Sequence, residues 1–158
     1  MRILLIHPKL ENNFFEDIML PPLGLAYIAG ALRHANCYNI RILDANVSKT
    51  PFLDIDKTVN EYSPEVIGIT VTTPLMKTSL RIAKLIKNAK KDTKIIFGGI
   101  HPTLFAKAVI NEELIDYVVF GEGEKTIVEL ISAINQKKEP EGIPGVAFKR
   151  NGTIILNA

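Results

Sequence analysis

The chain has 158 residues, 47% hydrophobic and 23% charged, which fits one globular domain of the usual ~100–200 residues. Its net charge of +2 is too small to indicate a nucleic-acid partner, and its single cysteine, Cys37, excludes a disulfide framework or a four-cysteine cluster built from this chain alone. No secretory leader and no apolar run near the ~18 residues of a membrane span is visible, so we expect a cytoplasmic protein without a membrane partner.

Short apolar runs alternate with longer segments of helical periodicity as far as about residue 136. The runs are apolar at consecutive positions, which is typical of strands covered by helices on both faces. Strands are expected at 3–6, 40–43, 66–71, 95–97 and 117–120, and helices at 23–33, 53–62, 75–91, 103–110 and 124–136.

Strands joined by crossovers of this length predict a parallel sheet with helices on both faces. The first strand runs into His7-Pro8 and no glycine follows before Gly24, so the G-x-G-x-x-G of a dinucleotide-binding domain is missing. That absence favours the flavodoxin-like (Rossmann-like) strand order 2-1-3-4-5. We therefore predict a doubly wound α/β domain with a five-stranded parallel sheet over residues 1–138.

The character of the chain changes after Lys138. Residues 139–142 (EPEG) are typical of a linker, and Asn151-Gly152 between two apolar runs predicts a β-hairpin. An isolated hairpin is marginally stable in water, so it must pack either on the edge of the sheet or on another domain. Residues 139–158 are expected to form this linker and hairpin.

Ligands of open parallel sheets bind at the carboxyl ends of the strands. Gly98-Gly99 follows the fourth strand and allows a flat ligand to approach the backbone, although a plain turn explains the pair as well. The hydroxyls of residues 70–73 (TVTT) can donate to ligand oxygens or ring nitrogens, or reflect β-propensity and helix capping. Residues 121–124 (GEGE) place two carboxylates at a helix N-terminus. They can contact a ligand, or they only complement the helix dipole.

The histidines and the basic helix give weaker indications. His7 and His101 fall at the ligand edge and His34 at a helix end, but neither His7 nor His101 has a second histidine or cysteine at helical spacing. No serine or cysteine nucleophile lies beside a base, so we predict neither a metal site nor a catalytic residue in this chain. The basic face of residues 75–91 carries no aromatic residue and is expected to be solvated.

Four segments occur in order along the chain: 21–29 (PPLGLAYIA), 98–103 (GGIHPT), 116–126 (DYVVFGEGEKT) and 143–148 (IPGVAF), the last followed by Asn151-Gly152. They resemble P-P-L-G-L-x-Y-L/I-A, G-G-x-H-P-T, D-x-V-V-x-G-E-G-E-x-T and I-P-G-L/V-x-F/Y, respectively. These are motifs of the N-terminal cobalamin (B12)-binding domain of B12-dependent radical-SAM enzymes. Each motif alone is modest, but all four in this order are specific.

The resemblance implies a cobalamin site at the carboxyl edge. The double glycine of such domains admits the dimethylbenzimidazole nucleotide tail, and the S-x-L segment corresponds to residues 70–72. The P-P-L-G loop would lie near the corrin, with residues 121–124 (GEGE) at the rim. The implied cofactor-binding residues are Pro22, Leu23, Gly24, Thr70, Thr72, Thr73, Gly98, Gly99, His101, Pro102, Thr103, Gly121, Glu122 and Gly123.

The sequence departs from related motifs at two places. Methionine-synthase-like domains carry D-x-H-x-x-G after the first strand, whereas residues 6–11 here are IHPKLE. The resemblance therefore implies base-off cobalamin with no cobalt bond from His7. One cysteine cannot supply the C-x-x-x-C-x-x-C that holds a [4Fe-4S] cluster. The cluster and S-adenosylmethionine are expected in a radical-SAM domain in cis, outside this chain.

The main hypothesis is a binding module that holds cobalamin for a radical-SAM methyltransferase or cyclase-type enzyme and is not catalytic on its own. The alternative is a family domain that no longer binds cobalamin and serves as a structural or substrate-recognition scaffold. A bulky residue above Gly98-Gly99 would indicate the scaffold. A stand-alone flavodoxin-like enzyme or receiver is disfavoured, because the phosphate loop and the acidic cluster of those proteins are missing.

Overall fold

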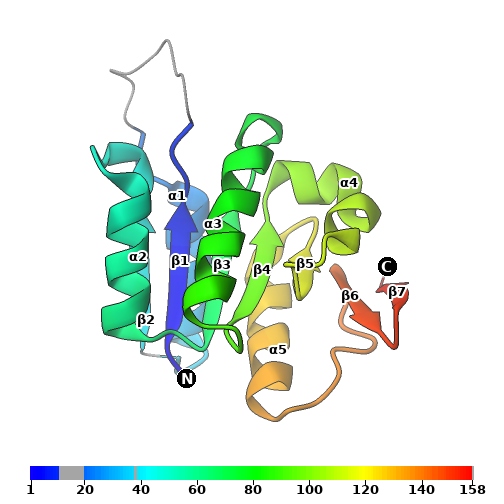
Figure 1. Ribbon diagram of the computed structural model, residues 1–158. Helices are drawn as coiled ribbons and strands as arrows, with labels where there is room; N and C mark the ends of the chain where they lie inside the picture. Colours follow the sequence, from blue (N-terminus) through cyan, green and yellow to red (C-terminus); the bar gives the residue numbers. More distant parts are fainter. Residues whose placement is uncertain (11–19, 38, 158) are drawn as a thin grey trace.

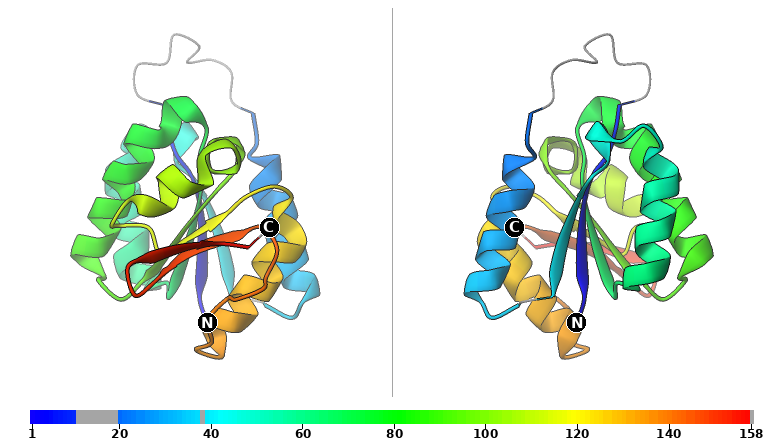
Figure 2. Two further views of the ribbon diagram at one scale, coloured as in Figure 1. Left: turned by 90° about the vertical axis from the view of Figure 1, so that its right-hand side faces the viewer. Right: turned by 90° about the vertical axis from the view of Figure 1, so that its left-hand side faces the viewer.

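The computed structural model describes residues 1–10, 20–37 and 39–157. A seven-stranded sheet of order β2-β1-β3-β4-β5-β6-β7 lies between two helical layers, with α2, α3 and α4 on one face and α1 and α5 on the other (Figures 1 and 2). The strands are β1 (Ile3–His7), β2 (Ile40–Asp44), β3 (Val66–Thr70), β4 (Lys94–Gly98), β5 (Tyr117–Val119), β6 (Val146–Arg150) and β7 (Thr153–Leu156). The helices are α1 (Leu23–His34), α2 (Pro51–Tyr62), α3 (Met76–Ala89), α4 (Ile100–Asn111) and α5 (Gly123–Asn135), with 3-10 turns η1 (Ala45–Val47) and η2 (Thr73–Leu75).

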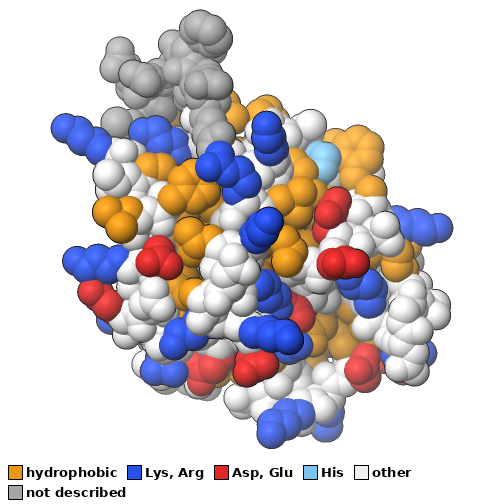
Figure 3. All heavy atoms as spheres, viewed as in Figure 1, with side chains coloured by type: hydrophobic (Ala, Val, Ile, Leu, Met, Phe, Trp, Pro, Cys, Tyr) orange, Lys and Arg blue, Asp and Glu red, His pale blue; other side chains and the backbone are white. Residues whose placement is uncertain are grey.

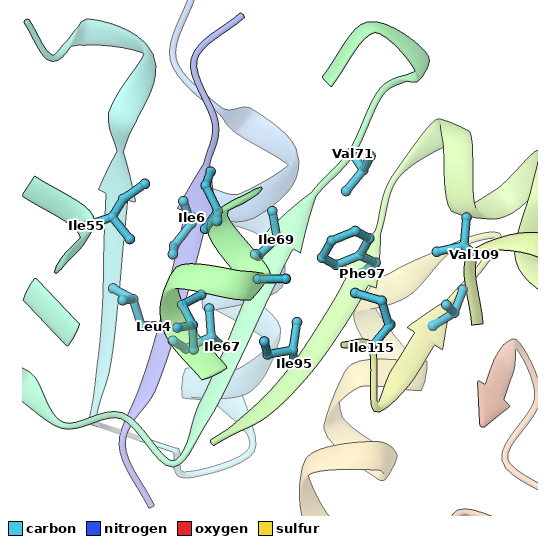
Figure 4. Close-up of a cluster of buried hydrophobic side chains, with 14 of the residues drawn as sticks. Leu4, Ile6, Ile55, Ile67, Ile69, Val71, Ile95, Phe97, Val109 and Ile115 are labelled. Carbon is cyan, nitrogen blue, oxygen red and sulfur yellow. The ribbon is translucent and has the colours of Figure 1, made fainter. Parts of the chain in front are cut away.

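The parallel order 2-1-3-4-5 that the sequence predicted is confirmed. Successive side chains of a strand point to opposite faces, so each central strand contributes to two cores. Leu4 and Ile6 of β1 pack toward α2 and α3, as Figure 4 shows together with their neighbours from β3 and β4. Ile3 and Leu5 pack toward α1 and α5. This two-sided burial explains why the strand residues are apolar at consecutive positions.

The hairpin packs on the edge of the sheet, which decides between the two possibilities left open by its sequence. β6 pairs with β5 in antiparallel fashion and β7 pairs with β6 (Figure 2). Its start is fastened by Phe120 N, which donates to Gly145 O at 2.9 Å, and by Thr126 Oγ1, which donates to Pro144 O at 3.0 Å. The hairpin is thus an extension of the sheet.

Helix α4 begins at Ile100, three residues earlier than the sequence pattern indicated, so most of the GGIHPT segment is helical. Pro102 allows this early start because the N–H groups of a first helical turn have no partner within the helix. The helix is interrupted at Phe105, whose φ of −131° and ψ of 35° are not helical.

The expectation that the basic face of α3 is solvated holds for most of its cations, which lie over the helix in Figure 3. Lys87 is half-buried instead, and Arg81 lies over the Phe52 ring. Lys87 Nζ donates to Asp116 Oδ2 at 2.7 Å and to Thr93 O at 2.8 Å. Asp116 also binds Lys94 Nζ at 3.1 Å and accepts from Ile95 N at 2.9 Å, so one carboxylate joins α3, β4 and β5. Burial alone would lower the pKa of Lys94, but the Asp116 carboxylate outweighs it and the pKa is raised.

Among the described residues, no helix is both long and apolar enough to cross a membrane.

Because the hairpin packs on the sheet, alanine substitutions at Gly142 and Gly145 should differ in their effect on stability, although both glycines have a φ of +77°. A Cβ at Gly145 would lie 2.8 Å from Phe120 O, whereas a Cβ at Gly142 would have no atom within 4 Å. Gly142→Ala should lower the free energy of unfolding by about 1 kcal/mol, the strain of a left-handed alanine. Gly145→Ala should lower the free energy of unfolding by roughly 2 kcal/mol more than Gly142→Ala, because the backbone at Phe120 must shift. Urea unfolding measures both, and equal losses would contradict a tightly docked hairpin.

Candidate functional site

A cavity of about 180 Å³ lies at the carboxyl edge of the sheet, between its central strands and the helices α1 and α5. The edge is the upper one in Figure 1, where the arrowheads of β1 and β4 point. The carboxyl edge is where open parallel sheets bind their ligands. The cavity is lined by Leu5, Gly24, Leu25, Ile28, Gly68, Ile69, Thr70, Ile96, Gly98, Gly99, Val119, Gly121, Glu122, Gly123, Glu124 and Ile127.

The floor of the cavity is a row of residues that runs across β1, β3 and β4. Leu5 is opposite Gly68, and Gly68 is opposite Ile96. A Cβ at Gly68 would lie 2.9 Å from Leu5 Cδ2 and would take up part of this space. Glycine inside a strand often marks the close approach of a ligand or backbone. Gly68 therefore forms a notch in a row of large side chains, which α1 and α5 cover with Leu25 and Ile127.

The mouth of the cavity lies two residues further along the same strands. Thr70 is opposite Gly98 there, and both are half-buried. A Cβ added at Gly98 would make an ordinary contact of 3.7 Å with Val119 O. The packing of the chain would therefore tolerate a side chain at Gly98. Its absence leaves space at the mouth of the cavity.

Gly99 has a different function from Gly98. Its φ is +102°, and a Cβ would lie 3.0 Å from Val71 O and 3.1 Å from Thr70 Oγ1. The turn after β4 lies this close to the end of β3 because Val71 N donates to Gly98 O at 2.8 Å and His101 N donates to Val71 O at 3.1 Å. The close contact of two backbone segments thus requires Gly99, whatever binds beside it.

Polar side chains connect the loops at this edge. Thr103 Oγ1 donates to Gly99 O at 2.8 Å and accepts from Gly121 N at 3.0 Å, which ties the turn after β4 to the loop after β5. Thr73 Oγ1 and His101 Nδ1 are 3.0 Å apart in a hydrogen bond, and the His101 ring packs against Phe105 with a centroid distance of 4.9 Å.

The starts of α1 and α5 form the other wall. A Cβ at Gly123 would lie 3.0 Å from Ile28 Cδ1, so glycine allows the two helices to pack closely. Glu122 is exposed and Glu124 half-buried at the first turn of α5, where a carboxylate complements the helix dipole. These carboxylates give the rim acceptors for ligand hydroxyl or amide groups.

Seven of the residues that the sequence singled out line the cavity: Gly24, Thr70, Gly98, Gly99, Gly121, Glu122 and Gly123. The other seven lie at or beside the same edge, outside the lining: Pro22, Leu23, Thr72, Thr73, His101, Pro102 and Thr103. Glu124, which the resemblance placed at the rim, also lines the cavity, whereas sequence reasoning missed Gly68 and the apolar floor. The available signal for Gly68 was a glycine within a run of β-branched residues.

His7 lies at the end of β1 and outside the cavity lining. Its Nδ1 is 3.0 Å from Asp44 Oδ1, and the same carboxylate oxygen accepts from Asn46 N at 3.1 Å. Within the part of the chain that the structure describes, no three histidine, cysteine or acidic side chains gather to hold a metal ion.

Comparison with known proteins gives consistent results. Residues 19–131 match the family model described as "B12 binding domain". An uncharacterized methyltransferase of Pyrococcus horikoshii is 36% identical over 157 residues, which are 98% of this chain and 34% of that protein. The anaerobic magnesium-protoporphyrin IX monomethyl ester cyclase of Synechocystis sp. is 31% identical over 161 residues, 98% of this chain and 32% of that protein. The chain thus spans about a third of the length of these relatives.

Two solved structures share the fold. The radical S-adenosylmethionine methyltransferase TsrM from Kitasatospora setae, with cobalamin and a [4Fe-4S] cluster bound, gives a TM-score of 0.84 at 23% identity over 99% of this chain and 29% of that chain. The cobalamin-dependent S-adenosylmethionine radical enzyme OxsB, with aqua-cobalamin and S-adenosylmethionine bound, gives 0.83 at 19% identity over 99% of this chain and 22% of that chain.

The different surroundings of Gly98 and Gly99 predict that their alanine variants differ in stability. Gly99→Ala should lower the free energy of unfolding by about 2–3 kcal/mol, because a left-handed φ and a backbone contact are both violated. Gly98→Ala, which meets only an ordinary contact, should cost less than about 1 kcal/mol. Thermal unfolding of both variants measures this, and a larger loss for Gly98→Ala would be inconsistent with the geometry described.

Proposed function

The chain belongs to the B12-binding domain family, and on this basis we propose that it is the cobalamin-holding module of a larger radical-SAM methyltransferase or cyclase-type enzyme. The observation that carries the proposal is the cavity at the carboxyl edge. Its lining residues, apart from Leu5, fall within the segment that matches the family.

The cavity suits the aromatic base of a cobalamin nucleotide tail. An apolar cavity of ~150 Å³ takes up benzene, so about 180 Å³ with an open mouth can receive the leading ring of such a base. Gly68 and Gly98 supply the space, since a side chain at either position would project into it. Thr70, Glu122 and Glu124 at the rim would bind the hydroxyl or amide groups of the ligand.

The corrin would then lie over the carboxyl edge, where several apolar side chains are exposed. Leu23 and Tyr27 of α1 are 64% and 67% exposed, and Ile100 and Leu104 of α4 are 58% and 64% exposed. Large exposed apolar side chains on both sides of a cavity are typical of a surface that is covered in use. Corrin and catalytic domain together would provide that cover.

Cobalamin supplies cobalt-centred methyl or radical chemistry when bound. The residues of this chain position it and exclude water from its tail. The base-off form follows if the tail is in the cavity. His7 lies outside the lining of the cavity, which supports a form without a cobalt bond from His7.

A bulky residue above the double glycine would have supported the scaffold alternative. Instead the space beside Gly98 belongs to the cavity, and an added Cβ there meets only an ordinary contact. The open site favours cobalamin binding over the scaffold.

The remaining parts of the parent enzyme would lie outside this chain. The relatives are about three times as long as this chain, and TsrM and OxsB are radical S-adenosylmethionine enzymes. Both observations support a radical-SAM domain in cis that binds S-adenosylmethionine and the [4Fe-4S] cluster. Residues 1–138 would hold the cofactor, and residues 139–158 would lead toward that domain.

Titration of the 158-residue chain with hydroxocobalamin tests the proposal. We expect one cobalamin per chain to co-elute in gel filtration, with visible bands shifted toward the base-off form. Gly98→Ala should bind roughly tenfold more weakly, because a methyl group narrows the mouth. Gly30→Ala is the matched control, since a Cβ at this exposed position of α1 has no atom within 4 Å.

Two results would contradict the proposal. A chain that is folded by circular dichroism but retains no cobalamin at tens of micromolar would overturn cobalamin holding by this module. If Gly98→Ala and Gly30→Ala weakened cobalamin binding equally, the cavity would not be the place where cobalamin binds.

A further inference from the structure

The polar side chains of the cavity are confined to its rim. Thr70, Glu122 and Glu124 are the lining residues that carry side-chain oxygen, and all three lie at the carboxyl edge. Below them the lining is apolar and buried: Leu5, Leu25, Ile96, Val119 and Ile127 are between 2% and 7% exposed. A ligand therefore passes from a polar mouth to a purely apolar interior.

The strand backbone adds no hydrogen-bonding group to this apolar interior. Gly68 lies between β1 and β4, paired in parallel with Leu5 on one side and Ile96 on the other. The amide and carbonyl groups of such a central strand are used in the sheet. The floor thus presents the Gly68 notch but no free donor or acceptor, so whatever lies there must have an apolar edge.

Corrinoids differ in the base at the end of their nucleotide tail. Dimethylbenzimidazole ends in a benzene ring with two methyl groups, whereas adenine ends in a ring with two nitrogen acceptors and an amino donor. Apolar lining leaves the polar edge of adenine without partners, and burying such groups unpaired is unfavourable. The methyl edge of dimethylbenzimidazole instead gains from removal from water.

Building on the proposed function, we infer that the cavity floor selects corrinoids by their lower base. It accepts the dimethylbenzimidazole of cobalamin and discriminates against a purine such as adenine. Val119, at the side of the cavity, and the row Leu5–Gly68–Ile96 at its floor are the residues that determine this specificity.

Isothermal titration calorimetry of the full chain with three aqua-corrinoids tests the inference. The ligands are cobalamin, the adenine-tailed cobamide and cobinamide, which lacks the nucleotide. We expect cobalamin to bind at least about tenfold more tightly than the adenine-tailed cobamide. Equal affinity for these two, with cobinamide much weaker, would overturn the inference and leave the proposed function intact. Equal affinity for all three would show that the tail is not in the cavity and would overturn the inference, whereas no binding of any of the three would overturn the proposed function.

A variant pair assigns the selectivity to the lining. Val119→Thr keeps the shape of the side chain and puts a hydroxyl in the cavity wall, so the preference for cobalamin over the adenine-tailed cobamide should fall severalfold. Val66→Thr makes the same change in the same core, at a residue that is 1% exposed and outside the lining, and should leave the ratio unchanged. An unchanged ratio in a folded Val119→Thr variant, or equal changes in both, would overturn the assignment.

Discussion

Two hydrogen bonds between backbone groups hold the turn after β4 against the end of β3. Val71 N donates to Gly98 O and His101 N donates to Val71 O. The turn can come this close only because Gly99 has no side chain and a φ of +102°. With the turn in this position, Gly98 stands beside Thr70 at the mouth, α4 begins at Ile100, and Thr103 reaches the loop after β5. The arrangement of the carboxyl edge follows from this contact.

The two faces of the sheet have different functions. The face under α2, α3 and α4 is packed with large aliphatic side chains and Phe97, and it supplies stability. The face under α1 and α5 contains Gly68, and glycine in a strand interior costs roughly 0.5–1 kcal/mol relative to alanine. A ligand that fills the cavity binds the folded chain and not the unfolded one, so binding stabilises the fold.

The domain shares its fold with cobalamin-binding enzymes of low sequence identity, while its motifs include the turns at which β4 and β5 end and α4 and α5 begin. Such a division follows from the fold. Strand residues need only be apolar and of suitable size, so many sequences satisfy them. The loops must meet one another and a ligand at defined positions, which restricts residues such as Gly99 and Thr103 much more narrowly.

The hydrophobic pattern of the sequence determined the strands, because strands buried on both faces are apolar at consecutive positions. The crossover connections determined the parallel order, and with it the edge of the sheet at which the site lies. The sequence also identified the loops that form the mouth. Tertiary structure alone decided which residues form the floor. Whether Gly68 faces a cavity depends on the register of β1 and β4 beside it, and register is a relation between strands distant in sequence. For the same reason only the folded chain showed the hairpin on β5, the ion pair of Lys87 with Asp116, and the different functions of Gly98 and Gly99.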